Sequence, residues 1–222
     1  MKKLLLTTTL LFCLSLFAQD AYFDLGVGVG LSSTIYDSQL IDNQSSGVTN
    51  LYHHSDLAFD IGGKIGVKTV NDRSFYIVAD VFWANYSEGN LEEIRISNLT
   101  NSVKINTSHL FFGPGFVFYP ISSIQFASSI GWVRTNAQVK YVTSTAYQKN
   151  SETYNSFKIG YGLNTSVAVD FSGRGPGILL GVKGTVIKND IKINTNSQSN
   201  LPKLNLDLSD SYVSMFIKYR YR

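Results

Sequence analysis

Histidine has the widest chemical range of the residues in this chain, and the sequence holds three: His53, His54 and His109. A histidine beside a hydroxyl and a carboxylate can form a nucleophilic triad, and grouped histidines can hold a metal ion. Adjacent residues of an extended chain point to opposite sides, so His53 and His54 are not expected to chelate one ion. His109 shares a strand face with Thr107, but the sequence places no carboxylate beside it. We therefore predict no catalytic residue, no metal site and no cofactor.

Charged residues that interrupt apolar stretches form a second candidate set. Six are basic and four are acidic: Asp24, Asp60, Lys64, Lys68, Asp80, Lys158, Asp170, Lys183, Lys218 and Arg220. An unpaired charge in a narrow, dry interior is unfavourable by several kcal/mol, which favours a network of ion pairs that fills the interior. The excess of basic groups leaves a selectivity path for anions as the alternative.

The elements that would position these residues are strands, because apolar and other residues alternate around them. In the first stretch, every second residue from Phe23 to Leu31 is apolar. A period of two indicates a strand whose two faces meet different surroundings. Eight such stretches are predicted, at residues 21–31, 57–69, 75–86, 105–119, 124–139, 154–171, 177–188 and 211–222.

The connectors between these strands alternate in length. Short turns are predicted at 70–74, 120–123 and 172–176, and long polar loops at 32–56, 87–104, 140–153 and 189–210. An even number of strands with short turns on one side and long loops on the other is typical of an outer-membrane β-barrel. Functional residues often lie on loops that a rigid scaffold holds. Loops 32–56 and 189–210 are therefore the candidates for contact with an extracellular ligand.

Aromatic residues are predicted to mark the two membrane interfaces. Trp83 follows the start of its strand by eight residues, as does Trp132. Eight residues of a tilted strand climb about 20 Å, which puts both indoles near the outer interface, where Trp and Tyr are enriched. The residues expected at the opposite interface are Tyr119, Phe171, Tyr219 and Tyr221.

A soluble barrel of the lipocalin type is the competing fold, because it also has eight alternating strands but turns its apolar face inward. The polar face of this chain decides against it. Glycines such as Gly26, Gly28 and Gly162 lie on that face beside charged residues. Small residues beside charges suit a narrow lumen, where eight strands leave just enough room for side chains.

The N-terminal segment is predicted to be a signal peptide spanning residues 1–18. Lys2 and Lys3 precede an apolar run, and Ala18 precedes the expected cleavage point. Removal of this segment also removes Cys13, so residues 19–222 hold no thiol and no disulfide. Without Lys2 and Lys3 the basic residues fall from 19 to 17, against 16 acidic ones, which gives no reason to expect nucleic acid as a partner.

The chain resembles the small outer-membrane β-barrel proteins of the OmpA-transmembrane-domain and OmpX type, which are often described as porin-family proteins. The resemblance rests on the signal peptide, the glycine-rich first strand from Leu25 to Leu31 and the last strand from Tyr212 to Arg222. In that family the final residue is usually aromatic and is recognised by the barrel-assembly machinery. Here the aromatic Tyr221 is penultimate. The resemblance implies assembly by that machinery and contact with outer-membrane lipid.

Taken together, the sequence predicts a monomeric, antiparallel, up-and-down barrel of eight strands over residues 19–222, in the outer membrane of a Gram-negative bacterium. The expected role is structural or that of a surface binder, with no enzymatic activity. A narrow channel for a small solute is the first alternative. A lipid-modifying barrel enzyme that uses His53 or His109 is the second.

Overall fold

The structure is a computed structural model that describes residues 21–39, 49–69, 74–86, 89–96, 99–144, 149–172, 176–193, 204–207 and 209–221. The predicted signal peptide, residues 1–18, lies outside these ranges. Eight long strands form the barrel: β1 (Ala21–Gln39), β2 (Thr49–Lys68), β3 (Phe75–Tyr86), β5 (Leu99–Ile121), β6 (Ile124–Ser144), β7 (Lys149–Asp170), β8 (Gly177–Lys188) and β11 (Asp210–Tyr221). Three further strands are short: β4 (Gly89–Ile96), β9 (Asp190–Ile193) and β10 (Leu204–Asp207).

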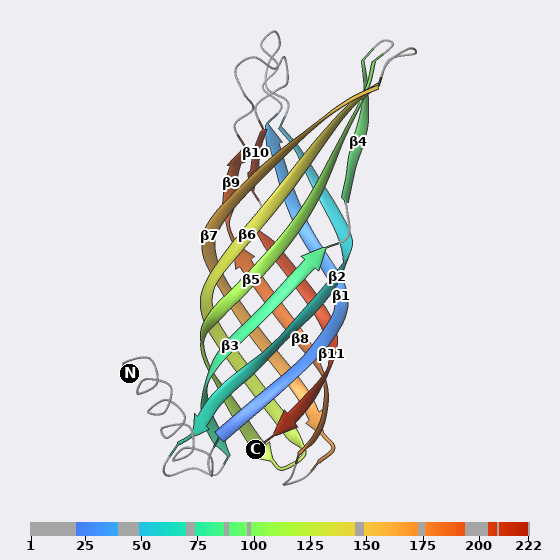
Figure 1. The fold of residues 1–222 in the computed structure, drawn as a ribbon. Helices are drawn as coiled ribbons and strands as arrows, with labels where there is room; N and C mark the ends of the chain where they lie inside the picture. The colour runs from blue at the N-terminus through green and yellow to red at the C-terminus, as the bar shows by residue number, and fades with distance from the viewer. Residues whose placement is uncertain are drawn as a thin grey trace, which may run out of the picture.

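The eight long strands close on themselves. Each pairs antiparallel with its neighbour along the chain, β3 pairs with β5, and β1 pairs with β11 to complete the ring. Figure 1 shows the strands tilted around one axis, with the start of β1 and the end of β11 at the lower end. The predicted fold, an eight-stranded antiparallel up-and-down barrel, is confirmed. Within the described residues there is no helix long and apolar enough to cross a membrane.

The two faces of the barrel wall differ as the period of two predicted. Along β11, side chains alternate between buried and exposed from Asp210 to Tyr221. The exposed positions carry Val213, Met215 and Ile217, and every other barrel strand also exposes large apolar side chains outward. The buried positions of β11 carry Asp210, Ser214, Lys218 and Arg220 together with the rings of Tyr212 and Phe216. Apolar side chains outside and charges inside are the reverse of a lipocalin, so the soluble alternative is wrong.

Glycine leaves room for a charge on the inner face of β1. A Cβ atom added at Gly28 would lie 2.6 Å from Asp60 Oδ2, closer than real Cβ contacts allow. Gly28 therefore leaves space for the carboxylate of Asp60 on β2, whereas Cβ atoms at Gly26 and Gly30 would meet β11.

The prediction of long loops is wrong for much of their length, because several strands continue beyond the apolar pattern. β1 and β2 stay paired up to Gln39 and Thr49, and β6 and β7 up to Ser144 and Lys149. His53 and His54 consequently lie within β2 rather than in a loop. The backbone hydrogen bonds between strands do not depend on alternating side chains, so the strands stay paired beyond the point where the apolar alternation ends. In Figure 1 these strands rise above the body of the barrel, and β4 to β7 rise together on one side.

Candidate functional site

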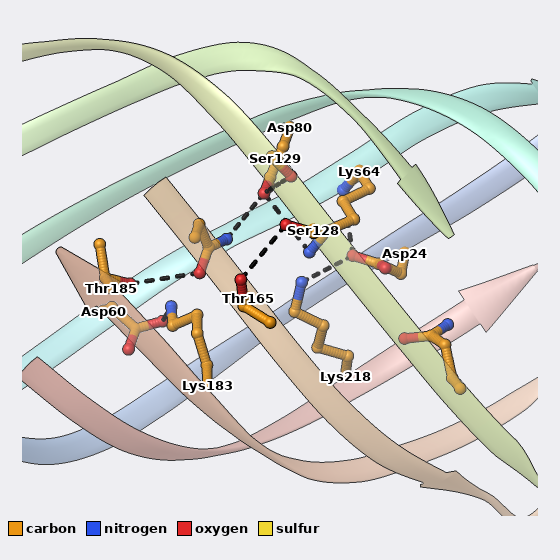
Figure 2. Close-up of polar contacts among 12 residues, drawn as sticks. Asp24, Asp60, Lys64, Asp80, Ser128, Ser129, Thr165, Lys183, Thr185 and Lys218 are labelled. Atoms are coloured by element: carbon orange, nitrogen blue, oxygen red, sulfur yellow. Dashed lines mark hydrogen bonds and ion pairs between the residues drawn. The ribbon is translucent and has the colours of Figure 1, made fainter. Parts of the chain in front are cut away.

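The interior of the barrel contains the predicted charges, and its middle is held by three ion pairs. Lys183 Nζ lies 2.5 Å from Asp60 Oδ1, and Lys218 Nζ lies 2.8 Å from Asp24 Oδ1. Lys64 Nζ lies 3.5 Å from Asp80 Oδ2. Figure 2 shows the three pairs side by side between the strands. Asp60 and Lys183 come from β2 and β8, which are not neighbours in the sheet, so this pair bridges the lumen.

Asp80 links this middle layer to the far wall. Its Oδ2 accepts hydrogen bonds from Ser129 Oγ and from Asn164 Nδ2, both at 2.7 Å. Thr185 Oγ1 donates in turn to Asn164 Oδ1 at 3.2 Å. One carboxylate on β3 therefore ties together β6, β7 and β8. Buried carboxylates with several donors are strongly held, since each bond replaces a lost contact with water.

The lower end of the lumen is closed by tyrosines and a buried arginine. Gln125 Nε2 donates to Tyr22 Oη at 2.6 Å and to Tyr119 Oη at 2.7 Å. Arg220 is fully buried, and its Nη1 lies 2.7 Å from Asp170 Oδ2. Arg220 Nη1 also donates to Tyr119 Oη at 3.5 Å, so these contacts join β1, β5, β6, β7 and β11 across the bore.

The upper end of the lumen is filled mainly by rings. Phe82 and Phe111 stack with their centroids 4.8 Å apart, and Tyr86 meets Tyr212 edge-on at 5.8 Å. Lys183 Nζ lies 4.6 Å from the centre of the Phe82 ring, in cation–π contact. Lys183 thus connects this layer of rings to the ion pairs below it.

His109 belongs to this upper layer, and the structure brings it near both a hydroxyl and a carboxylate. His109 Nδ1 and Thr135 Oγ1 are 2.8 Å apart, and His109 Nε2 lies 3.8 Å from Asp210 Oδ2. The sequence did not indicate that carboxylate. Thr135, however, has no exposed surface, and the Tyr86 ring covers His109 at 5.0 Å between centroids. A nucleophile must reach its substrate, so this geometry supports a packed polar cluster more than a catalytic site.

Eight of the ten predicted lumen residues are buried: Asp24, Asp60, Lys64, Asp80, Asp170, Lys183, Lys218 and Arg220. Lys68, near the lower end of β2, is half-buried. Lys158 is exposed, and its prediction as a lumen residue is wrong. The pairing of β7 with β8 ends at Tyr161 and Lys188, so Lys158 lies beyond the last pair, at the open rim of that wall.

One predicted interface aromatic is also wrong. Tyr119 is only 4% exposed and points into the lumen. It follows His109 by ten residues, an even number, so both occupy the same face of β5. The other five expected interface residues point outward and are exposed: Trp83, Trp132, Phe171, Tyr219 and Tyr221.

Several lumen residues were missed because they are uncharged or lie at a strand end. They are Tyr22, Gln125, Ser129, Asn164, Thr185 and Asp210. Tyr22, Asn164, Thr185 and Asp210 share the inward parity of a predicted lumen residue on the same strand, so parity alone could have found these four. Gln125 and Ser129 lie on β6, which carries none of the ten predicted residues.

The comparisons bear on the fold. No protein-family model matches the sequence, and no curated protein matches it. The chain is similar to a solved structure of the outer membrane protein OprG from Pseudomonas aeruginosa, with 11% identity, a TM-score of 0.52, and coverage of 91% of this chain and 96% of that one. It is also similar to Ail, the attachment invasion locus protein of Yersinia pestis, with 10% identity, a TM-score of 0.42 and coverage of 89% and 98%. The outer membrane protease OmpT from Escherichia coli follows, with 7% identity, a TM-score of 0.44 and coverage of 91% and 97%. The likeness to OprG supports the barrel fold, and fold alone does not fix function.

Proposed function

We propose that this chain is an integral outer-membrane β-barrel with a sealed lumen, whose role is carried by the parts that stand outside the membrane. The observation that carries the proposal is the filled interior. Tyrosines and Arg220 close the lower end, three ion pairs cross the middle, and stacked rings fill the upper end. The apolar outer face supports the membrane setting, because soluble proteins rarely expose so large a continuous apolar surface.

A channel for anions is the alternative, and two features argue against it. An eight-stranded barrel is just wide enough for its own side chains to fill. With Lys158 at the rim and Lys68 half-buried, the buried charges of the predicted set are four acidic and four basic. The excess of basic groups that suggested an anion path is therefore absent from the buried part of the set.

The strand pairs in segments 32–56 and 189–210 offer a scaffold for binding outside the membrane. In segment 32–56, β1 and β2 remain paired from Ser32 and Asp56 up to Gln39 and Thr49. In segment 189–210, β9 and β10 form a second small ribbon. Paired strands hold their backbone in a fixed arrangement, which lowers the entropy lost on binding. We propose that these segments present a surface to extracellular ligands and that the chain has no enzymatic activity.

Planar-bilayer conductance tests the sealed lumen. Residues 19–222 are refolded in detergent, shown to be folded by their shift on an unheated gel, and inserted into a bilayer. We expect no step-like openings at any applied voltage. Reproducible single-channel openings would contradict the proposal and support the channel, and Lys183 and Lys218 would be the residues to substitute next.

A further inference from the structure

An open groove lies on the outside of the barrel, over β3, β5, β6 and β7, with a volume of about 400 Å³. That volume is near the lower end of the range for small-molecule sites, about 300–1,000 Å³. Five of its lining side chains are carboxamides: Asn85, Asn106, Asn136, Gln138 and Asn155. None of them takes part in the lumen network described above.

The strand register explains why these residues gather. Asn85 pairs with Ser108, Ser108 with Asn136, and Asn136 with Phe157, so one row crosses four strands. Asn106, Gln138 and Asn155 form a second row above it, where Gln138 Nε2 donates to Asn155 Oδ1 at 3.2 Å. Both rows have the parity opposite to that of His109 and Thr135. They therefore lie on the outward face of the wall.

The groove begins where the apolar band ends. Trp83 lines its lower edge, two residues before Asn85, and is 40% exposed. Two residues of a strand span about 7 Å. Phe157 lines the groove as well, and the guanidinium of Arg134 lies 4.9 Å from the centre of its ring. Trp83 thus stands between the apolar band and the carboxamides, and Phe157 stands at the end of the lower carboxamide row.

The lining residues indicate the chemistry of the ligand. No lining side chain carries a charge, whereas phosphate or carboxylate recognition relies on Arg or Lys. Each carboxamide offers both donors and an acceptor, as the hydroxyl groups of a saccharide require. The flat rings of Trp83 and Phe157 can contact the C–H face of a sugar. The position at the edge of the apolar band suits a sugar attached to a lipid.

We infer that this groove binds the uncharged saccharide headgroup of a glycolipid in the outer leaflet. The inference rests on the proposed membrane setting and names a ligand class for the surface just above the band. The acyl chains would lie along the apolar wall below Trp83, while the sugar occupies the two carboxamide rows.

Trp83 provides the reporter, because the chain has two tryptophans and the other, Trp132, does not line the groove. The probe protein is Trp132→Phe, reconstituted in phosphatidylcholine vesicles. We expect diglucosyl diacylglycerol, added to the vesicles in rising proportion, to shift the emission of Trp83 to saturation. The Trp83→Phe protein, which reports from Trp132, should not respond.

The triple variant Asn106→Ala, Asn136→Ala and Asn155→Ala removes hydrogen-bonding groups from both rows. We expect its half-saturation to rise more than about tenfold, since each lost hydrogen bond contributes about 1 kcal/mol and 1.4 kcal/mol is tenfold. The matched control is Thr153→Ala with Ser211→Ala, two exposed positions outside the groove. This control should respond like the parent.

Three results would overturn the inference: an unchanged response in the triple variant, an equal response to vesicles with phosphatidylglycerol in place of the glycolipid, or an equal response to free maltose. The last would point to a soluble sugar and against a lipid-borne one. The shift on an unheated gel shows in each case that the variant is folded. Conductance of the same preparations tests the sealed lumen separately, so failure of the groove and failure of the proposed function remain distinguishable.

Discussion

The inner and outer faces of β5, β6 and β7 place neighbouring residues in opposite roles. Thr135 points inward, has no exposed surface and bonds to His109. Asn136, the next residue, points outward into the groove. Inside, polar groups hold one another. Outside, the carboxamides of the groove face the surroundings.

This difference separates residues that maintain the barrel from residues that can meet a ligand. A buried charge needs its partner, because an isolated charge in a dry interior is strongly unfavourable. An exposed carboxamide keeps its contacts with water and can exchange them for contacts with a sugar at little cost. Substitutions inside should therefore change stability, and substitutions in the groove should change binding.

The largest effect is expected from breaking the ion pair that bridges the lumen. Lys183→Met leaves the Asp60 carboxylate buried, and we expect a loss of about 3–5 kcal/mol in the free energy of unfolding. The measurement is denaturant unfolding in phospholipid vesicles, followed by tryptophan emission. Asp60→Leu combined with Lys183→Met removes both charges and should recover most of the loss. A double variant as unstable as the sum of the two single variants would show that the pair itself is not the cause.

A smaller loss of stability is expected from filling the space beside the Asp60–Lys183 ion pair. Gly28→Ala places a Cβ atom against Asp60 Oδ2, and Asp60 cannot move away because Lys183 holds its other oxygen. Overpacking of this kind destabilises by about 1–3 kcal/mol. Gly184→Ala is the matched control, since no atom lies within 4 Å of the Cβ it would add. Removing backbone freedom there should leave the free energy of unfolding unchanged or raise it by about 0.4–1 kcal/mol. Equal losses in the two variants would mean that the clash at Gly28 is relieved.

The strands and the faces of most predicted residues followed from the period of two, because a closed wall separates two different environments at every residue. The register between distant strands did not follow. Asp210 on β11 and His109 on β5 meet across the lumen. Nothing in the sequence fixes the relative height of these two residues along the barrel axis. Lys158 shows the same limit, because its parity is inward but its height puts it at the rim.

The sequence does not predict the groove, because the groove also depends on the register between strands. Asn106, Asn136 and Asn155 lie on three strands at the boundary between the apolar pattern and the polar extensions, where alternation fades. Only the register of β5 to β7 brings them into adjacent rows. Tyr119, in contrast, lies at the lower end of β5, at the height expected of an interface aromatic, but its parity turns it inward. Height along the barrel axis and the face of the strand are separate properties, and parity decides only the face.

The sharpest test of the comparison comes from the two adjacent residues, Thr135 and Asn136. Thr135→Val removes a buried hydrogen bond and leaves His109 Nδ1 without that partner, so we expect a loss of about 1–3 kcal/mol in the free energy of unfolding. Asn136→Ala lies on the exposed face and should stay within about 0.5 kcal/mol of the parent. The order should reverse in the Trp83 assay, where Asn136→Ala weakens the glycolipid response and Thr135→Val does not. If both variants changed both properties together, the wall would transmit strain between its faces, and the division of roles between inner and outer residues would not hold.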